Sequence, residues 1–131
     1  MPDLRPAILV VDDEPTVREI LAAMVAHLGY RPLPAAGGAE AVGAYLSERP
    51  APAAAVLDVR MPGMDGPATL TALRALNPAL PCVFVSGDTG HHSAANLMAR
   101  GAVAVLGKLV GLTVLGAALA AATGRAAGAG A

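Results

Sequence analysis

Three short, uninterrupted apolar runs constrain the fold of this chain more than any other feature of its sequence. They span residues 7–11, 53–57 and 82–85. With four or five residues each, the runs are too short for typical helices and have the length of strands. A strand that is apolar on both faces is typical of the centre of a parallel sheet that helices cover on both sides.

Segments with helical periodicity separate these runs. Pro15 suits the first turn of a helix, where its missing N–H costs nothing. Apolar residues then recur every three or four positions, and Gly29 is the expected stop. This helix face is predicted to comprise Val17, Ile20, Leu21, Met24 and Leu28. Further helices are predicted at residues 39–46, 67–76, 92–99 and 112–122.

Two weaker runs complete the set of predicted strands. Residues 31–35 contain Pro32 and Pro34, which lack a ladder donor and therefore favour a sheet edge. Residues 103–106 form the fifth run. Five strands alternating with helices predict an α/β domain, in which right-handed crossovers build a doubly wound parallel sheet. With residues 31–35 at an edge, the expected strand order is 2-1-3-4-5, the flavodoxin-like arrangement.

Length and charge bound the remaining organisation. The 131 residues suit one domain, expected over residues 6–122, followed by a glycine- and alanine-rich tail at 123–131 that we expect to be disordered. A formal net charge of -1 offers no bulk attraction to nucleic acid or to an anionic membrane. The apolar stretch at 109–122 is shorter than the roughly 20 residues that span a bilayer.

Cysteine content indicates the compartment. Cys82 is the single cysteine, so it cannot form an intramolecular disulfide, and no signal peptide is visible at the N-terminus. Both observations favour a cytoplasmic protein. Because Cys82 opens an apolar run, we expect a buried and unreactive thiol.

Polar residues stand at the carboxyl ends of four predicted strands. Asp12 and Asp13 follow the first strand, Asp58 the third, Ser86 the fourth, and Lys108, the only lysine, the fifth. Ligands of such a sheet bind outside the carboxyl ends of its strands, near the point between strands one and three where the strand order reverses. These residues are therefore expected to converge on one shallow cleft.

Their chemistry points to phosphoryl transfer. Three neighbouring carboxylates repel one another unless a cation lies among them, and oxygen ligands without His or Cys favour Mg²⁺. A carboxylate can also attack phosphorus, giving an aspartyl phosphate. The Lys108 ammonium and the Ser86 hydroxyl can each bind a phosphoryl oxygen. One acid at a strand end is usually an ordinary loop residue, but the combination at four strand ends favours a site.

With these residues at its strand ends, the sequence resembles the receiver (response regulator) domain of two-component signalling. The resemblance rests on Asp12-Asp13, on residues 58–66 (Asp-Val-Arg-Met-Pro-Gly-Met-Asp-Gly), on Ser86-Gly87 and on Lys108, and it covers residues 6 to 122. It implies that Asp58 is the phosphoacceptor.

The resemblance also assigns the other site residues. It implies that Asp13, Asp58 and the backbone carbonyl of Arg60 coordinate Mg²⁺, while Asp12 acts mainly through a bound water. Ser86 and Lys108 would each hold a phosphoryl oxygen. In the loop after Asp58, Pro62 and Gly66 would shape the turn, and Asp65 would help start the next helix.

The resemblance further implies partners. A sensor histidine kinase or a phosphotransfer protein would supply the phosphoryl group, and the domain would catalyse its own phosphorylation and slow autodephosphorylation without being a conventional enzyme. With no DNA-binding segment after the domain, we expect output through an effector protein rather than through nucleic acid or membrane. The face of the fourth helix, fifth strand and fifth helix is the expected contact surface and a candidate homodimer interface.

Two departures from the family pattern concern signal transmission. Leu109 stands where the family has a proline after the lysine, so we expect a trans Lys108–Leu109 peptide that could displace the ammonium. Val105 replaces an aromatic residue that swings inward in the family. Both departures motivate an alternative function, a phosphorylation-independent interaction module, or pseudo-receiver, that keeps only the fold.

Two further hypotheses concern hydrolase activity and the pair of histidines after the fourth strand. A hydrolase that forms an aspartyl phosphate usually carries a second acid two residues after its nucleophile, and Arg60 occupies that place. His91 and His92 follow the fourth strand and are interpreted as solvated loop residues. Their alternative role is a partner contact or metal binding, although two adjacent histidines alone make a poor metal site.

Overall fold

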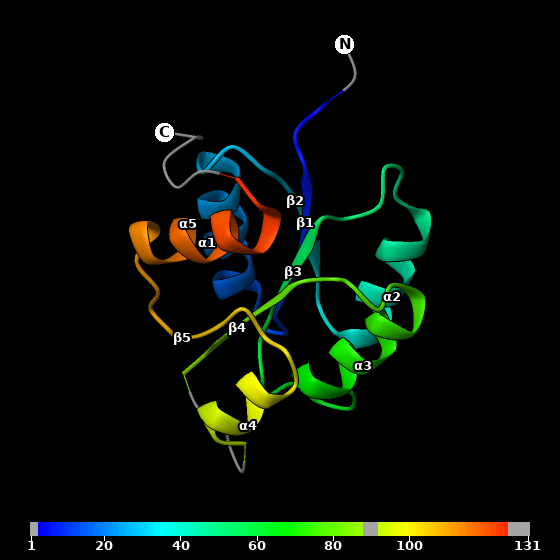
Figure 1. Cartoon of the computed structure of the whole chain (residues 1–131), viewed down its shortest axis with the longest axis vertical. Helices are drawn as coiled ribbons and strands as arrows, with labels where there is room; N and C mark the ends of the chain where they lie inside the picture. The colour runs from blue at the N-terminus through cyan, green and yellow to red at the C-terminus, as the bar shows by residue number, and fades with distance from the viewer. Residues whose placement is uncertain (1–2, 88–91, 126–131) are drawn as a thin grey trace.

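A computed structural model describes residues 3–87 and 92–125, which form a five-stranded parallel sheet between two layers of helices (Figure 1). The predicted and observed bounds of every element agree to within two residues. In chain order the elements are β1 (Ala7–Val11), α1 (Pro15–His27), β2 (Arg31–Ala35), α2 (Gly38–Ser47), β3 (Ala54–Leu57), α3 (Gly66–Leu76), β4 (Cys82–Ser86), α4 (Ala94–Ala99), β5 (Ala104–Gly107) and α5 (Leu112–Thr123).

The strand order is β2-β1-β3-β4-β5, which confirms the predicted topology. Every residue of β1, β3 and β4 is buried, as their continuous apolar sequences predict, whereas β2 and β5 are partly exposed at the two edges. Pro32 and Pro34 lie in the edge strand β2, where a missing N–H leaves no central ladder bond unmade.

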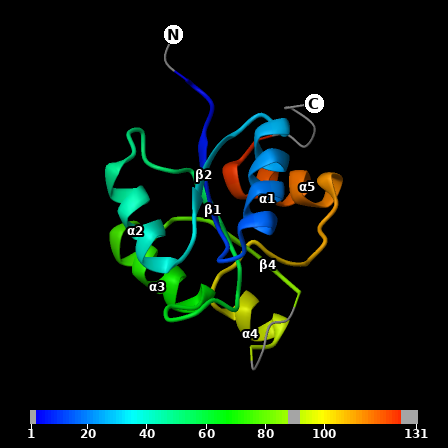
Figure 2. The ribbon, with the colours of Figure 1, turned by 180° about the vertical axis from the view of Figure 1, so that it is seen from behind.

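Each face of the sheet packs against its own helices, as the two opposite views show (Figures 1 and 2). Ile8 and Val10 of β1 point toward α1 and α5, where they join the buried side chains of Leu21, Val25, Leu115 and Leu119. Leu9 and Val11 point the other way, toward α2, α3 and α4, and join Tyr45, Leu70, Leu73 and Leu97. Alternation along one strand therefore gives the domain two cores that share a sheet.

Helix α1 begins at Pro15 and ends before Gly29, whose φ of 96° is the left-handed conformation that glycine adopts readily. The predicted inner face of α1 is wrong at Ile20, whose side chain is 50% exposed. The buried stripe instead centres on Leu21 and Val25. Three-and-four spacing includes positions at the border of a helix face, and packing against the sheet decides which of them are buried.

Thr123 is the last residue of α5 and its hydroxyl lies 3.2 Å from the Tyr30 hydroxyl, while residues 126–131 of the expected tail lie outside the described residues. Among the described residues, no helix is both long and apolar enough to cross a bilayer. Cys82 is a buried free thiol, as predicted, and burial raises its pKa to about 12.

Candidate functional site at the carboxyl ends of the strands

The two central strands bring three carboxylates together. β1 and β3 are paired, with Val11 beside Leu57, so the residues that follow them are neighbours. The Asp58 N–H donates to the Val11 carbonyl at 2.9 Å, which fixes the start of the β3–α3 loop. Carboxylate oxygens of Asp12, Asp13 and Asp58 all lie within 4.8 Å of one another. The predicted acid cluster is therefore present.

The β1–α1 loop gives its two acids different environments. Asp12 is fully buried, and its Oδ1 accepts a hydrogen bond from the Glu14 N–H at 2.9 Å. Arg18, one turn into α1, donates through Nη1 to the Asp12 carbonyl at 2.8 Å. Asp13 is exposed and lines the cavity. The contact of Arg18 was not predicted, because nothing in helical spacing marks a side chain that folds back onto the preceding loop.

The β3–α3 loop turns sharply behind Asp58. The Gly66 N–H donates to the Val59 carbonyl at 2.8 Å, and a Cβ on Gly66 would overlap the Asp58 carbonyl oxygen and come within 2.9 Å of Val59 Cα. Only glycine therefore allows this close approach of two backbone segments. Asp65 caps α3 by accepting from the Ala68 N–H at 2.9 Å, which confirms its expected place at the helix start.

Lys108 reaches the acids from β5. Its Nζ lies 2.9 Å from Asp12 Oδ2 and 3.4 Å from Asp58 Oδ2, and its backbone N–H donates to the Ser86 carbonyl at 3.2 Å. The expected trans Lys108–Leu109 peptide is wrong, because this bond is cis, and the ammonium is not displaced. The expectation considered only the local preference of a non-proline peptide, and not the contacts of Lys108 with Asp12, Asp58 and Ser86 at the ends of three other strands.

The surroundings of the site affect the charged forms of Asp58 and Lys108 in opposite ways. Burial, and next the charge of Asp12, raise the pKa of Asp58 to about 6, although Lys108 opposes the shift. Burial alone would lower the pKa of Lys108, but contacts with Asp12 and Asp58 together raise it above its ordinary value. The ammonium is therefore firmly protonated, while Asp58 ionises less readily than an exposed aspartate.

The acid cluster has the properties of a site for a divalent cation. Asp12 Oδ2 is buried and accepts no regularly oriented hydrogen bond among the described residues, although Lys108 Nζ is near. Three carboxylates against one ammonium leave excess negative charge, and every donor in the cluster is oxygen. Mg²⁺ prefers such donors. Receiver domains bind Mg²⁺ at an acidic pocket of this kind, so the residues present fit the ion.

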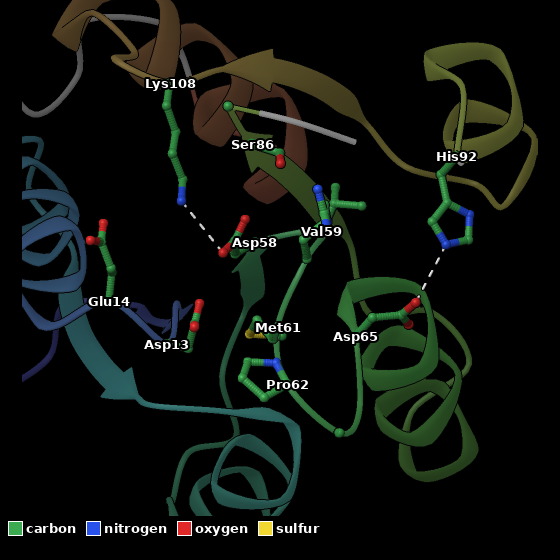
Figure 3. A pocket seen from close by; sticks show the side chains of 13 residues that line it. Asp13, Glu14, Asp58, Val59, Met61, Pro62, Asp65, Ser86, His92 and Lys108 are labelled. Carbon is green, nitrogen blue, oxygen red and sulfur yellow. Dashed lines mark hydrogen bonds and ion pairs between the residues drawn. The ribbon is translucent and has the colours of Figure 1, made fainter. Parts of the chain in front are cut away.

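An open cavity of about 790 Å³ lies over the acids (Figure 3). Five of the six predicted site residues line it, namely Asp13, Asp58, Arg60, Ser86 and Lys108, while Asp12 lies buried beneath. Ser86 is the last residue of β4 and is buried at the cavity wall. The lining residues are Asp13, Glu14, Asp58, Val59, Arg60, Met61, Pro62, Gly63, Asp65, Ser86, Gly87, His92 and Lys108.

His92 is not the solvated loop residue that was predicted. Its side chain is only 12% exposed, and its Nε2 lies 3.4 Å from Asp65 Oδ2 at the edge of the cavity (Figure 3). His91, the other member of the pair, lies outside the described residues. Sequence spacing gave no signal for this contact, because it joins two loops whose backbone paths depend on the whole fold.

The two departures from the family pattern lie on β5 and just after it. Val105 pairs with Phe84 of β4 and packs, partly buried, against the core shared with α2, α3 and α4. Leu109 is 93% exposed and borders a small apolar groove that Val17, Ile20 and Lys108 also line. Lys108 therefore lies between the polar cavity and this apolar groove, and it lines both.

Known protein sequences that are similar to this chain are response regulators. The sequence model of the response regulator receiver domain matches residues 8–120. A putative NtrX-like response regulator of Rickettsia bellii is 34% identical over 97 residues, which are 72% of this chain and 20% of that protein. The DNA-binding transcriptional regulator NtrC of Escherichia coli is 32% identical over 104 residues, 79% of this chain and 22% of that protein. This chain thus spans about a fifth of the length of these relatives.

Solved structures share the fold. A response regulator receiver protein of Pseudomonas putida matches with a TM-score of 0.79 and 32% identity, over 88% of this chain and 95% of that chain. A receiver domain protein of Clostridium thermocellum matches with a TM-score of 0.83 over 91% of this chain and 94% of that chain, and at 24% identity it supports the fold alone.

Proposed function

Because this chain belongs to the response regulator receiver domain family, we propose that it accepts a phosphoryl group on Asp58 and signals through the modified state. The observation that carries the proposal is the geometry around Asp58. Its carboxylate lies beside the Lys108 ammonium and within 4.8 Å of two further acids, in a cavity that is open to a phosphoryl donor.

The proposed donor is a phosphohistidine on a sensor histidine kinase or a phosphotransfer protein. An Oδ atom of ionised Asp58 forms the new bond to phosphorus as the phosphorus–nitrogen bond breaks, and the electron pair of that bond stays on the donor imidazole. Mg²⁺, held by Asp13, Asp58 and the Arg60 carbonyl, would supply charge neutralisation when bound. Slow hydrolysis of the acyl phosphate by water would reset the domain.

The surrounding side chains have distinct roles in this proposal. Lys108 pairs with one phosphoryl oxygen, and the Ser86 hydroxyl, which lines the same cavity, binds another. Asp12 stays beneath, where it holds the ammonium at 2.9 Å. When Mg²⁺ is bound, Asp12 would act on it mainly through a water. Since burial raises the pKa of Asp58 to about 6, positive charge from Lys108 and the cation keeps this nucleophile ionised at neutral pH.

Output is proposed to pass to an effector protein across the face of α4, β5 and α5. Met98, Leu112 and Val114 expose apolar side chains on these two helices, which suits a protein partner or a second copy of the chain. We further propose a cytoplasmic location, which the single buried thiol supports.

The experiment is to incubate the chain with acetyl phosphate and Mg²⁺ and to measure its intact mass. We expect a gain of one phosphoryl group in the wild type and none in Asp58→Asn. Asp65→Asn is the matched control, because Asp65 lines the same cavity but caps a helix, a task that asparagine also performs. A wild type that gains no phosphoryl group would remove the proposal.

A second candidate function is a phosphorylation-independent interaction module. The observation that favours it is Val105, which is fixed by the core and has no ring with which to report the state of the site. A partner that binds equally well to the wild type and to Asp58→Asn, with and without acetyl phosphate, would support this alternative.

A further inference from the structure

Helix α4 is held to the domain by few apolar contacts. It has six residues, and Leu97 is its one buried side chain. Ser93 caps the helix by accepting from the Asn96 N–H at 3.0 Å, which stabilises the helix itself but does not attach it to the rest of the domain. The position of α4 therefore depends strongly on polar contacts at its two ends.

Arg74 of α3 holds the C-terminal end of α4. Its guanidinium donates to three carbonyls, from Nε to Leu80 at 3.2 Å, from Nη1 to Arg100 at 2.5 Å and from Nη2 to Gly101 at 3.1 Å. Arg100 is the C-cap of α4 and Gly101 follows it. The planar guanidinium thus fixes the turn after α4 against α3.

The N-terminal end of α4 is held by His92. This residue precedes the N-cap Ser93, and its imidazole points across the cavity edge to Asp65, the N-cap of α3 (Figure 3). His92 and Asp65 both line the cavity that contains Asp58, whereas the Arg74 contacts lie elsewhere. Of these two polar contacts, which join described residues at the ends of α4, the one at the N-terminal end therefore borders the cavity and the other does not.

We propose that the His92–Asp65 contact couples the state of Asp58 to the position of α4. The inference rests on the proposed function, because it needs a phosphoryl group on Asp58. A phosphoryl group carries about -1.5 to -2 charges and three acceptor oxygens. Within the shared cavity it competes with the Asp65 carboxylate for the imidazole. The N-terminal end of α4 then shifts, while Arg74 retains the other end.

This coupling would transmit the state of the site to the surface without an aromatic residue on β5. Val105 offers no ring that could move between the site and the surface. The His92–Asp65 contact instead connects the cavity directly to α4, whose Met98 is exposed on the proposed output face. His92 and Asp65 are thus positioning residues for the output, and phosphoryl transfer to Asp58 does not require them.

The test is a backbone amide NMR titration of the full ¹⁵N-labelled chain with Mg²⁺ and beryllofluoride, an analogue of the phosphoryl group. In the wild type we expect shifts at Ser86 and Gly87, beside the site, and at Leu97 and Met98, in α4. In His92→Ala and in Asp65→Ser the shifts of Ser86 and Gly87 should persist, while those of Leu97 and Met98 should fall to less than half. Serine keeps the helix cap but is too short to reach the imidazole.

The double variant, with both His92→Ala and Asp65→Ser, is expected to respond like either single variant, because each change removes the same contact. His27→Gln is the control, because His27 lies in the last turn of α1 and does not line the cavity, and it should behave as the wild type. If Leu97 and Met98 respond fully in both single variants while Ser86 and Gly87 also respond, the coupling is overturned and the proposed function stands. If Ser86 and Gly87 fail to respond in the wild type, the proposed function fails and the coupling fails with it.

Discussion

At the scale of the single residue, Asp58 carries a charge that its surroundings oppose. Asp58 is 4% exposed. Its burial, and next the charge of Asp12, raise the pKa of its carboxyl to about 6, against roughly 3.9 in an unfolded chain. Because the folded pKa is the higher one, Asp58 contributes stability below about pH 4, and this contribution is lost as the pH rises through 6.

Asp58→Asn should therefore stabilise the metal-free protein at high pH only. We expect a gain of about 1–2 kcal/mol in the free energy of unfolding at pH 8, a value reduced because the open cavity admits solvent, and no gain at pH 4. Urea denaturation of both proteins in EDTA from pH 4 to pH 8 measures the difference. A gain of equal size at both ends of this range would show that ionisation of Asp58 is not its cause.

Mg²⁺ should stabilise the same cluster. At a free Mg²⁺ concentration ten times the dissociation constant, binding to the folded state adds about 1.4 kcal/mol to the free energy of unfolding. We expect this gain in the wild type and in Asp65→Asn, but a much smaller one in Asp13→Asn, which loses a cluster ligand. Thermal unfolding with EDTA and with rising Mg²⁺ tests the prediction, and equal gains in all three proteins would contradict it.

The sequence predicted the acids and the lysine because each directly follows a strand, and parallel strands end at one edge of the sheet. It did not predict the contacts of Arg18 or His92. His92 contacts a residue on another loop, 27 positions earlier, whereas the Arg18 side chain folds back six positions onto the loop before its own helix. No local periodicity encodes either contact. The peptide after Lys108 was predicted wrongly for a related reason, since local preference was weighed without the contacts of the lysine side chain.

At the scale of the element, the β3–α3 loop depends on one missing side chain. A Cβ on Gly66 would overlap the Asp58 carbonyl oxygen, and backbone on both sides cannot yield as a flexible side chain would. Gly66→Ala should therefore lower the free energy of unfolding by about 1–3 kcal/mol and slow phosphorylation of Asp58, because the loop must shift. Urea denaturation and the rate of mass gain with acetyl phosphate give the two readouts.

Gly43→Ala is the matched control for Gly66→Ala. Gly43 lies within α2, and a Cβ there would meet no atom within 4 Å. Alanine should raise the free energy of unfolding by about 0.5–1 kcal/mol through the lower entropy of the unfolded chain, with no effect on phosphorylation. A loss of stability of similar size in both variants would mean that the close approach at Gly66 is not the cause.

Helix α4 shows why element bounds were less predictable than element types. Its short sequence has one buried residue and therefore almost no apolar periodicity to mark its ends. Ser93 caps it, so the helix begins at Ala94, two residues later than the predicted start at residue 92. The long helices and the fully buried strands were easier, because in them burial and sequence pattern agree over many residues.

At the scale of the whole molecule, the strand order followed from two properties of the sequence. Continuous apolar runs marked β1, β3 and β4 as central, and the prolines of β2 marked an edge. What the sequence did not specify is how the two cores divide the helices between them. That division results from crossover handedness and packing, which place α1 and α5 together on one face (Figure 2).

The two cores should unfold together, because every central strand contributes side chains to both. The chain has two tyrosines and no tryptophan. Tyr30 packs in the core beneath α1 and α5, and Tyr45 in the core beneath α2, α3 and α4. With 3-fluorotyrosine at both positions, we expect the two ¹⁹F signals to lose their native intensity at the same urea concentration.

Mg²⁺ should raise both of these unfolding midpoints equally, since the acid cluster follows β1 and β3, which both cores share. Tyr45→Phe assigns the two signals without removing a buried ring. If the Tyr45 signal were lost at lower urea than the Tyr30 signal, the layer of α2, α3 and α4 would unfold separately. The site would then be stable only as long as that layer remains folded, because Asp58 and Asp65 flank the loop that leads into α3.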